Sequence, residues 1–314
     1  MVVPIPTQGA GMPDCSDHPW REPRMRRSMS TLLSILVIAC GRAENSARAV
    51  IQNKGSDTLI TVAQAWAEAY SAVDAEVAVA VSGGGSGTGI SAMINGTVDI
   101  ANSSRKMTSR EIEAARANGN DPVEHLVGHD ALAVYVHLDN PVGRLTLDQL
   151  AGIYGENGTI ERWSQLDVQV PGCASDEIVR VSRQNNSGTF AYFREAVLDN
   201  EDFKLGSHDM HGSKDVVHLV AQTPCSIGYS GMAYATPEVT MPCVMGTAGD
   251  PCIAPSIETA LDGSYPISRP LLMYTSGSPA GEVKAYLDWV LGDAGQCIML
   301  ELGYTPAMPA ECVQ

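Results

Sequence analysis

Apolar side chains along this chain follow two periods, and the two periods alternate. Val77, Val79 and Val81 alternate with other residues, which is typical of a strand that buries one face. Residues 59–72 are rich in alanine and include Gln64 and Glu68, all of which favour a helix. The pattern predicts strands at 49–52, 76–82, 98–101, 131–137 and 178–182, and helices at 59–72, from 90, at 110–118, from 147 and from 189.

The junctions between these predicted elements are short and polar. Thr108 and Glu111 have the spacing of a capping box, which predicts that the helix over 110–118 begins there. A second helix cap is predicted at Thr146. Strands that alternate with helices in this way imply an α/β sheet, in which loops at the strand ends face helix N-termini.

The first part of the chain has the pattern of a targeting segment. Several arginines precede an apolar run at 32–39, which is too short to span a bilayer but suits the apolar core of a signal peptide. The run ends at Cys40 in a stretch that resembles the lipobox of bacterial lipoproteins, in which the cysteine is lipidated. An ordinary signal peptide with a chance cysteine is the alternative. We expect a signal or pre-segment at 1–39, a lipid-anchored tether at 40–49, and an exported lipoprotein, periplasmic or at the cell surface.

Composition and charge narrow the class of protein. The chain has 314 residues, of which 44% are hydrophobic and 18% charged, as in ordinary globular proteins of about two domains. The net charge of −16 argues against nucleic acid as a partner, because duplex binding needs a basic face. An anionic ligand would have to be attracted locally, by oriented N–H dipoles, hydroxyls and one or two arginines.

The cysteines indicate disulfides. Apart from Cys15 in the pre-segment and Cys40, six of the eight cysteines remain, and an even number in an exported chain favours pairing. No pair has C-x-x-C spacing, which argues against a zinc or thioredoxin-like site. Many complete pairings are open to six cysteines, and the sequence alone does not choose among them. Our hypothesis is Cys173–Cys225, Cys243–Cys252 and Cys297–Cys312.

Four segments share one design, in which a strand end, a run of Ser, Thr or Gly, and a helix start follow one another: 55–58, 85–89, 103–105 and 187–189. Helix N-termini offer unpaired N–H groups and a partial positive charge, and glycine allows an oxyanion to approach closely. Arg183 adds a full charge and a planar fork of donors. Any single segment is better explained by ordinary helix capping, but four of them with Arg183 favour an anion site.

Four motifs typical of enzymes are absent. The glycine run at 83–89 has no following lysine, as a Walker A motif would, and is not the dinucleotide fingerprint. Ser86 does not lie in G-x-S-x-G, and His125 and His129 lack the H-E-x-x-H pattern of zinc proteases. We therefore expect no enzyme, with no catalytic residue, no metal and no cofactor.

Several stretches resemble the phosphate-binding proteins of bacterial phosphate ABC transporters, the PstS type. They run in order from about residue 50 to 308, at 55–58, 82–89, 99–105, 182–189, 227–229 and 265–271. The resemblance implies an α/β periplasmic-binding-protein fold of type II, with two lobes and two crossovers between them. It places lobe 1 at 50–128 plus 269–314, lobe 2 at 129–268, and the crossovers near 128–131 and 268–272.

The resemblance also implies a ligand, its partners and a set of site residues. Inorganic phosphate would bind in the cleft between the lobes and be delivered to a membrane permease, by a monomer held at the membrane through its lipid anchor. The family's ligand positions fall on Asp57, Thr58, Ser86, Ser104, Arg183, Ser187, Gly188 and Thr189.

One position departs from the family pattern. Better-known members have an aspartate at the place of Ser104, where it accepts a hydrogen bond from protonated phosphate and so rejects sulfate. We hypothesise that Asp57, the only acid in the four segments, takes this role. The family also often has an aspartate near Asn185 that partners the arginine, so Arg183 is either more available to the ligand or held by another acid. Arg105 is a candidate second cation, with a solvent-facing arginine as the equal alternative.

Other functions remain open. The protein could be a receptor for another tetrahedral oxyanion such as sulfate, or a phosphate sensor not coupled to transport. An enzyme that hydrolyses phosphate esters would need a nucleophile with a base, or a metal cluster, near the anion. The sequences of these segments contain neither arrangement.

Overall fold

The computed structural model describes residues 48–312. The predicted pre-segment at 1–39 and the lipidation of Cys40 lie outside the described residues. Among the helices of the described range, none combines the length and the apolar character needed to cross a bilayer.

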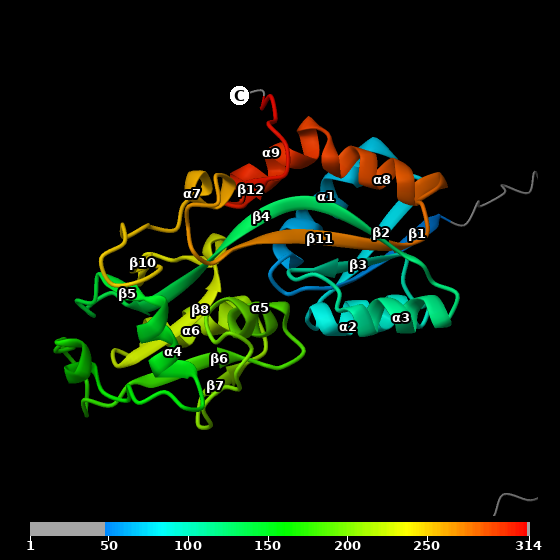
Figure 1. Cartoon of the computed structure of the whole chain (residues 1–314). Helices are drawn as coiled ribbons and strands as arrows, with labels where there is room; N and C mark the ends of the chain where they lie inside the picture. The colour runs from blue at the N-terminus through cyan, green and yellow to red at the C-terminus, as the bar shows by residue number, and fades with distance from the viewer. Residues whose placement is uncertain (1–47, 313–314) are drawn as a thin grey trace, which may run out of the picture. The chain divides into compact units, whose positions relative to one another are not determined.

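One long strand, β4 (Pro122–His137), connects two groups of strands (Figure 1). Through Ala131 it pairs antiparallel with β11 (Ser268–Ser276), and from Leu132 it pairs antiparallel with β8 (Ser226–Gly231). Neighbouring strands follow the order β2-β1-β3-β11-β4-β8-β6-β7. We call the strands from β2 to the first part of β4 the first strand group, and those from the second part of β4 to β7 the second strand group.

The first strand group is parallel at one side and antiparallel at the other. β1 pairs parallel with β2 and with β3, whereas β11 runs antiparallel to both β3 and β4. Figure 1 shows α1, α8 and α9 over one face of this group and α2 and α3 over the other. The bounds are β1 (Ala49–Gly55), β2 (Val77–Ser82), β3 (Ile100–Ser103), α1 (Ile60–Val73), α2 (Ser86–Ile94), α3 (Ser109–Ala117), α8 (Gly281–Leu291) and α9 (Asp293–Glu301).

Each face of the first group buries its own apolar cluster. On the α1 face, Trp66 and Tyr286 are fully buried, and the Trp66 indole donates to the carbonyl of Gly295 at 2.7 Å. On the α2 face, Ile90 and Met93 pack with residues of β3 and β11. All four residues of β3 are buried between these two faces, including the polar Asn102 and Ser103 that lead to the site.

The second strand group has a core of aromatic rings. Phe193 and Tyr229 stack with centroids 3.9 Å apart, and Tyr154 meets both of them edge-on. The Tyr154 hydroxyl donates to the carbonyls of Val181 and Ile227, which satisfies the polar end of a buried ring. The elements of this group are β6 (Val179–Arg183), β7 (His208–Met210), α4 (Leu147–Tyr154), α5 (Gly188–Ala196) and α6 (Ser213–Gln222).

Short elements complete the described part of the chain. β9 and β12 pair with β4, and β5 and β10 form a separate two-stranded sheet. The bounds are β5 (Arg144–Thr146), β9 (Val239–Thr240), β10 (Cys243–Met245), β12 (Thr305–Pro306), α7 (Ile257–Leu261), η1 (Trp163–Leu166) and η2 (Met232–Tyr234).

The α/β architecture expected from the sequence is confirmed. Thr108 and Glu111 form the predicted capping box, in which Thr108 Oγ1 accepts the Glu111 N–H at 3.2 Å. The cap at Thr146 is also present. The strand predicted over 131–137 was too short, because β4 begins at Pro122; its first part carries polar and charged residues, and its pairing with β11 compensates for their low strand propensity.

Three disulfides form with the partners of our hypothesis. The Cα atoms are 5.3 Å apart in Cys173–Cys225, 5.4 Å in Cys243–Cys252 and 5.5 Å in Cys297–Cys312. The second and third close short loops, whereas the first ties the segment after η1 to the start of β8. Such links stabilise chiefly by restricting the unfolded chain.

Candidate functional site

The loops that carry the site follow the ends of β1, β2, β3 and β6. β1 ends at Gly55, just before Asp57 and Thr58, and β3 ends just before Ser104. β2 leads through the glycine run into Ser86, the first residue of α2. β6 ends with Arg183, and its loop leads to Gly188, the first residue of α5. In open α/β sheets, ligands bind outside these carboxyl ends.

The structure brings all eight predicted ligand residues together, and all eight are buried. Arg183 Nη2 lies 3.2 Å from Asp57 Oδ2, which links the second strand group to the first. Asp57 Oδ1 accepts the Gly84 N–H at 2.9 Å. Asp57 is therefore the acid that holds Arg183, in place of the aspartate that the family often has near Asn185.

Two hydroxyl pairs lie beside this ion pair. Thr58 Oγ1 and Thr189 Oγ1 are 3.1 Å apart, and Ser86 Oγ and Ser104 Oγ are 3.3 Å apart. Gly188 lies against the second pair, and a Cβ on this residue would stand 2.5 Å from Ser104 Oγ and still closer to Ser86 Oγ. Only glycine allows this approach.

Ser187 has a local role in the same loop. Its hydroxyl accepts the Thr189 N–H at 3.1 Å and so caps α5. The capping interpretation of this segment is therefore correct for Ser187, while Gly188 and Thr189 face residues of the first strand group.

Arg183 is fixed on several sides. Its Nη1 donates to Ser213 Oγ at 3.0 Å, and its Nη2 donates to the carbonyl of His211 at 2.8 Å. Its Nε is buried and has no partner among the described residues. Burial lowers the pKa of the Arg183 guanidinium, Asp57 opposes that shift, and the nearby Arg269 adds to it. An arginine guanidinium stays protonated in proteins, so Arg183 is a cation.

Asn186 connects the two strand groups at the glycine run. Its carbonyl accepts the Gly87 N–H at 3.0 Å, and its side-chain Nδ2 donates to the Gly84 carbonyl at 2.9 Å. Gly85 has a φ of 88° and would place a Cβ 2.5 Å from the Asn186 carbonyl oxygen. The glycines of this run are needed for a left-handed backbone and for close contact with Asn186.

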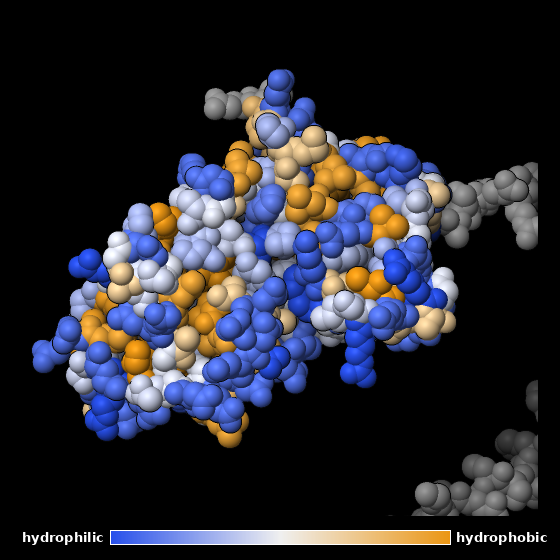
Figure 2. All heavy atoms as spheres, in the orientation of Figure 1, coloured by the Kyte–Doolittle hydropathy of each residue, from blue (hydrophilic) through white to orange (hydrophobic). Residues whose placement is uncertain are grey.

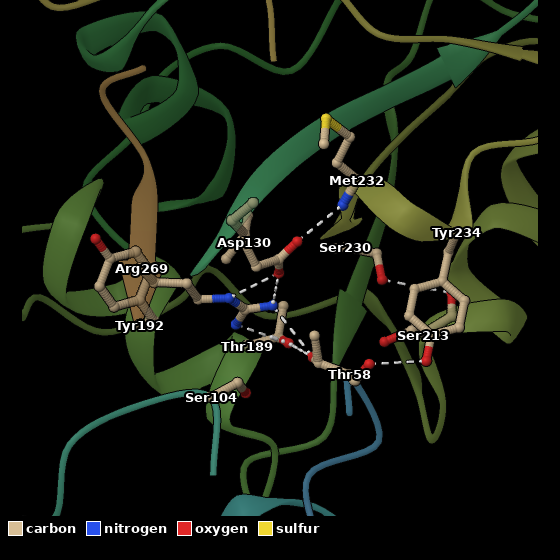
Figure 3. Close-up of polar contacts among 12 residues, drawn as sticks. Thr58, Ser104, Asp130, Thr189, Tyr192, Ser213, Ser230, Met232, Tyr234 and Arg269 are labelled. Atoms are coloured by element: carbon tan, nitrogen blue, oxygen red, sulfur yellow. Dashed lines mark hydrogen bonds and ion pairs between the residues drawn. The ribbon is translucent and has the colours of Figure 1, made fainter. Parts of the chain in front are cut away.

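Sequence reasoning missed a second arginine. Arg269 Nη1 donates to Thr189 Oγ1 at 3.0 Å and its Nη2 donates to Thr58 Oγ1 at 3.1 Å, while Asp130 lies behind it (Figure 3). Arg269 lies in the 265–271 stretch that resembles the family, but no helix start or glycine run marks it. The candidate second cation Arg105 instead pairs with Glu111 at 2.7 Å.

The outer surface gives little sign of this buried site. On the face in Figure 2, hydrophilic residues cover much of the area and hydrophobic residues gather in small groups. Among the large hydrophobic residues of the described range, Leu205 is the most exposed, at 91%. It lies in the loop before β7, in the second strand group.

Comparison with known proteins agrees with this fold. Residues 41–294 match the PBP superfamily domain. The chain is 32% identical over 275 residues to the phosphate-binding protein PstS of Pseudomonas aeruginosa, covering 84% of each, and 31% identical over 307 residues to protein SphX of Synechococcus elongatus, covering 92% of this chain and 88% of that one.

Solved structures show the same similarity. A putative phosphate ABC transporter substrate-binding protein with bound phosphate from Clostridium perfringens has a TM-score of 0.72 at 27% identity, over 82% of this chain and all of that one. A phosphate transport receptor from Vibrio cholerae has a TM-score of 0.66 at 26% identity over the same share of this chain and 100% of that one. The chain therefore belongs to the PBP superfamily and, within it, to the family of the phosphate-binding protein PstS.

Proposed function

We propose that this protein is an extracytoplasmic receptor that binds inorganic phosphate between its lobes and delivers it to an ABC importer, without catalysing a reaction. The observation that carries the proposal is a surplus of hydrogen-bond donors where four strand ends meet. Arg183 Nε has no partner among the described residues. The Ser86 and Ser104 hydroxyls share a single contact with each other, and Ser86 Oγ also accepts the Ser104 N–H at 3.0 Å. Whichever hydroxyl donates to the other, the second hydroxyl hydrogen has no acceptor among the described residues.

A buried donor without an acceptor is costly, and a tetrahedral oxyanion supplies acceptors on every side. The start of α2 at Ser86 and the start of α5 at Gly188 add oriented N–H groups at the same place. Arg183 supplies a full charge with planar donors. These groups attract an anion locally, although the chain as a whole carries a net charge of −16.

The arrangement in two lobes is part of the proposal. β4 pairs with β11 through Ala131 and with β8 from Leu132, and this change of pairing partner supports a first crossover near 128–131. β11 begins at the same border, which supports a second crossover near 268–272. Lobe 1 would be 50–128 plus 269–314, and lobe 2 would be 129–268. Closure would bring Asp57 of one lobe to Arg183 of the other. A lipid anchor at Cys40 would keep the monomer beside its permease.

The experiment that tests the function is titration calorimetry on protein freed of bound anion by partial unfolding and refolding. Phosphate and sulfate are titrated in parallel, and hydrolysis of a generic phosphate ester is assayed on the same sample. We expect tight one-to-one binding of phosphate, no heat with sulfate and no hydrolysis. Equal binding of both anions would make the protein a general oxyanion receptor, and no binding of either would refute the proposal.

Gly188→Ala is expected to weaken phosphate binding about 10-fold. The added Cβ would lie 2.5 Å from Ser104 Oγ, and relief of such overpacking costs about 1–3 kcal/mol. Because the clash lies between the two strand groups, we expect affinity to fall more than the free energy of unfolding. Calorimetry and thermal unfolding measure the two quantities. Gly143→Ala is the control, since no atom lies within 4 Å of its added Cβ; equal affinity in both variants would contradict the proposed closure.

A further inference from the structure

Arg269 lies in the first strand group at its border with the second. It lies on β11 directly opposite Asp130 on β4, next to the point where β4 changes its pairing partner. Its side chain is 0% exposed and that of Asp130 is 1% exposed. Asp130 Oδ2 accepts from Arg269 Nε at 3.0 Å and from Nη2 at 2.7 Å, which fixes the plane of the guanidinium.

Asp130 is itself held in place. Its Oδ1 accepts the Met232 N–H at 3.2 Å, and a Cβ at Gly231 would stand 2.9 Å from Oδ2, so glycine leaves room for the carboxylate (Figure 3). Burial raises the pKa of the Asp130 carboxyl, and the Arg269 cation opposes that rise. With its acid oriented this way, Arg269 directs its remaining hydrogens toward the two strand groups' threonines, Thr58 and Thr189.

The hydroxyls of Thr58 and Thr189 have more hydrogens to donate than they have acceptors among the described residues. Thr189 Oγ1 accepts from Arg269 Nη1 at 3.0 Å and lies 3.5 Å from Arg183 Nη1, while Thr58 Oγ1 accepts from Arg269 Nη2 at 3.1 Å. The two hydroxyls share a single contact with each other. Whichever of them donates, the hydrogen of the other has no acceptor among the described residues.

Arg269 adds a further donor without an acceptor. Its Nη1 makes a single hydrogen bond within the described range and so has one further N–H to offer. Two guanidinium groups, one from each strand group, therefore converge on the Thr58–Thr189 pair, and each is paired with one acid, Arg183 with Asp57 and Arg269 with Asp130. Among the described residues, one threonine hydrogen and one N–H of Arg269 are thus left without an acceptor between the two cations.

We propose that Arg269 is a second anion-binding arginine of the site, that it donates to an oxygen of the bound phosphate, and that Asp130 is its positioning residue. This inference rests on the proposed function. Because Arg269 lies near the start of β11, beside the point where β4 changes its pairing partner, the anion would be bonded to both strand groups and to the border between them. A planar guanidinium is required, since a lysine ammonium could not serve Asp130 and the anion with fixed geometry.

The test compares variants on protein freed of bound anion. Arg269→Lys keeps the charge, and the double variant Asp130→Asn/Arg269→Gln removes both charges together so that neither is left unpaired. We expect Arg269→Lys to weaken phosphate binding about 10-fold and the double variant to weaken it further, by about 100-fold, as the loss of charged hydrogen bonds implies. Thermal unfolding without anion reports any structural effect separately.

A spectroscopic measurement separates contact with the anion from a structural role. The ³¹P resonance of bound phosphate is expected to shift in Arg269→Lys, because the group beside a phosphate oxygen changes. Arg116→Lys is the matched control, since Arg116 is largely exposed and pairs with Asp121 outside the network. We expect its affinity to stay within about twofold of the wild type, the size of an ordinary surface effect, with an unchanged resonance.

The outcomes are distinguishable. If the wild type binds phosphate and both Arg269 variants bind it equally well with an unshifted resonance, Arg269 has only a structural role and the inference is wrong. Arg105→Lys tests the rival cation: if it weakens binding and Arg269→Lys does not, the second cation is Arg105 and the inference is wrong. If the wild type binds neither phosphate nor sulfate, the proposed function and the inference both fail.

Discussion

Arg183→Met is expected to lower phosphate affinity at least ~100-fold, the largest loss among single substitutions in this site. Arg183 is 1% exposed and bonds to Asp57, His211 and Ser213. Removing a buried, hydrogen-bonded charge costs about 2–5 kcal/mol, and here the loss also leaves the Asp57 carboxylate facing the anion without its cation. Calorimetry with phosphate measures the effect.

Two further variants separate binding from folding. Arg162→Met is the matched control, because Arg162 is exposed and its nearest acid, Glu177, is 4.0 Å away; its affinity should equal that of the wild type. The double variant Arg183→Met/Asp57→Asn removes the ion pair as a unit and should unfold at a temperature closer to that of the wild type than the single variant does. Retention of phosphate binding by a folded Arg183→Met protein would show that the anion binds elsewhere.

Asp57→Asn is expected to abolish the preference for phosphate over sulfate. Each oxygen of Asp57 accepts one hydrogen bond, from Gly84 and from Arg183, and a carboxylate oxygen has capacity for a second. Protonated phosphate would donate to this carboxylate, whereas sulfate would meet it oxygen to oxygen. An amide removes that repulsion, so sulfate affinity should rise relative to phosphate by about 10-fold or more. Competition between the two anions in calorimetry measures the ratio.

The same substitution on the surface serves as the control. Asp121→Asn removes a carboxylate that is 68% exposed and paired with Arg116, so selectivity should not change. A folded Asp57→Asn protein that keeps the wild-type ratio of phosphate to sulfate affinity would show that Asp57 only holds Arg183. The proton of the anion would then be recognised by another acceptor.

The sequence determined the features that depend on interactions between residues close together in the chain, such as helix starts and the polar segments at strand ends. Alternating periods predict the α/β class, and the spacing of Thr108 and Glu111 predicts a helix start that the structure contains. Ser, Thr and Gly at the strand ends identify Ser86 and Gly188 as site candidates, since their N–H groups and hydroxyls act locally. These signals lie within a few residues of one another, and a local pattern is sufficient to recognise them.

Tertiary structure alone decided which distant groups meet. Asp57 and Arg183 are 126 positions apart, and Asp130 and Arg269 are 139 apart, yet each pair forms a buried ion pair. Nothing beside Arg269 in the sequence distinguishes it from a solvated arginine. Its partner is set by the register of β11 on β4, and the free energy of a buried charge depends on that partner. The register between strands that are distant in the sequence depends on how the whole sheet packs. A local sequence pattern does not contain that information.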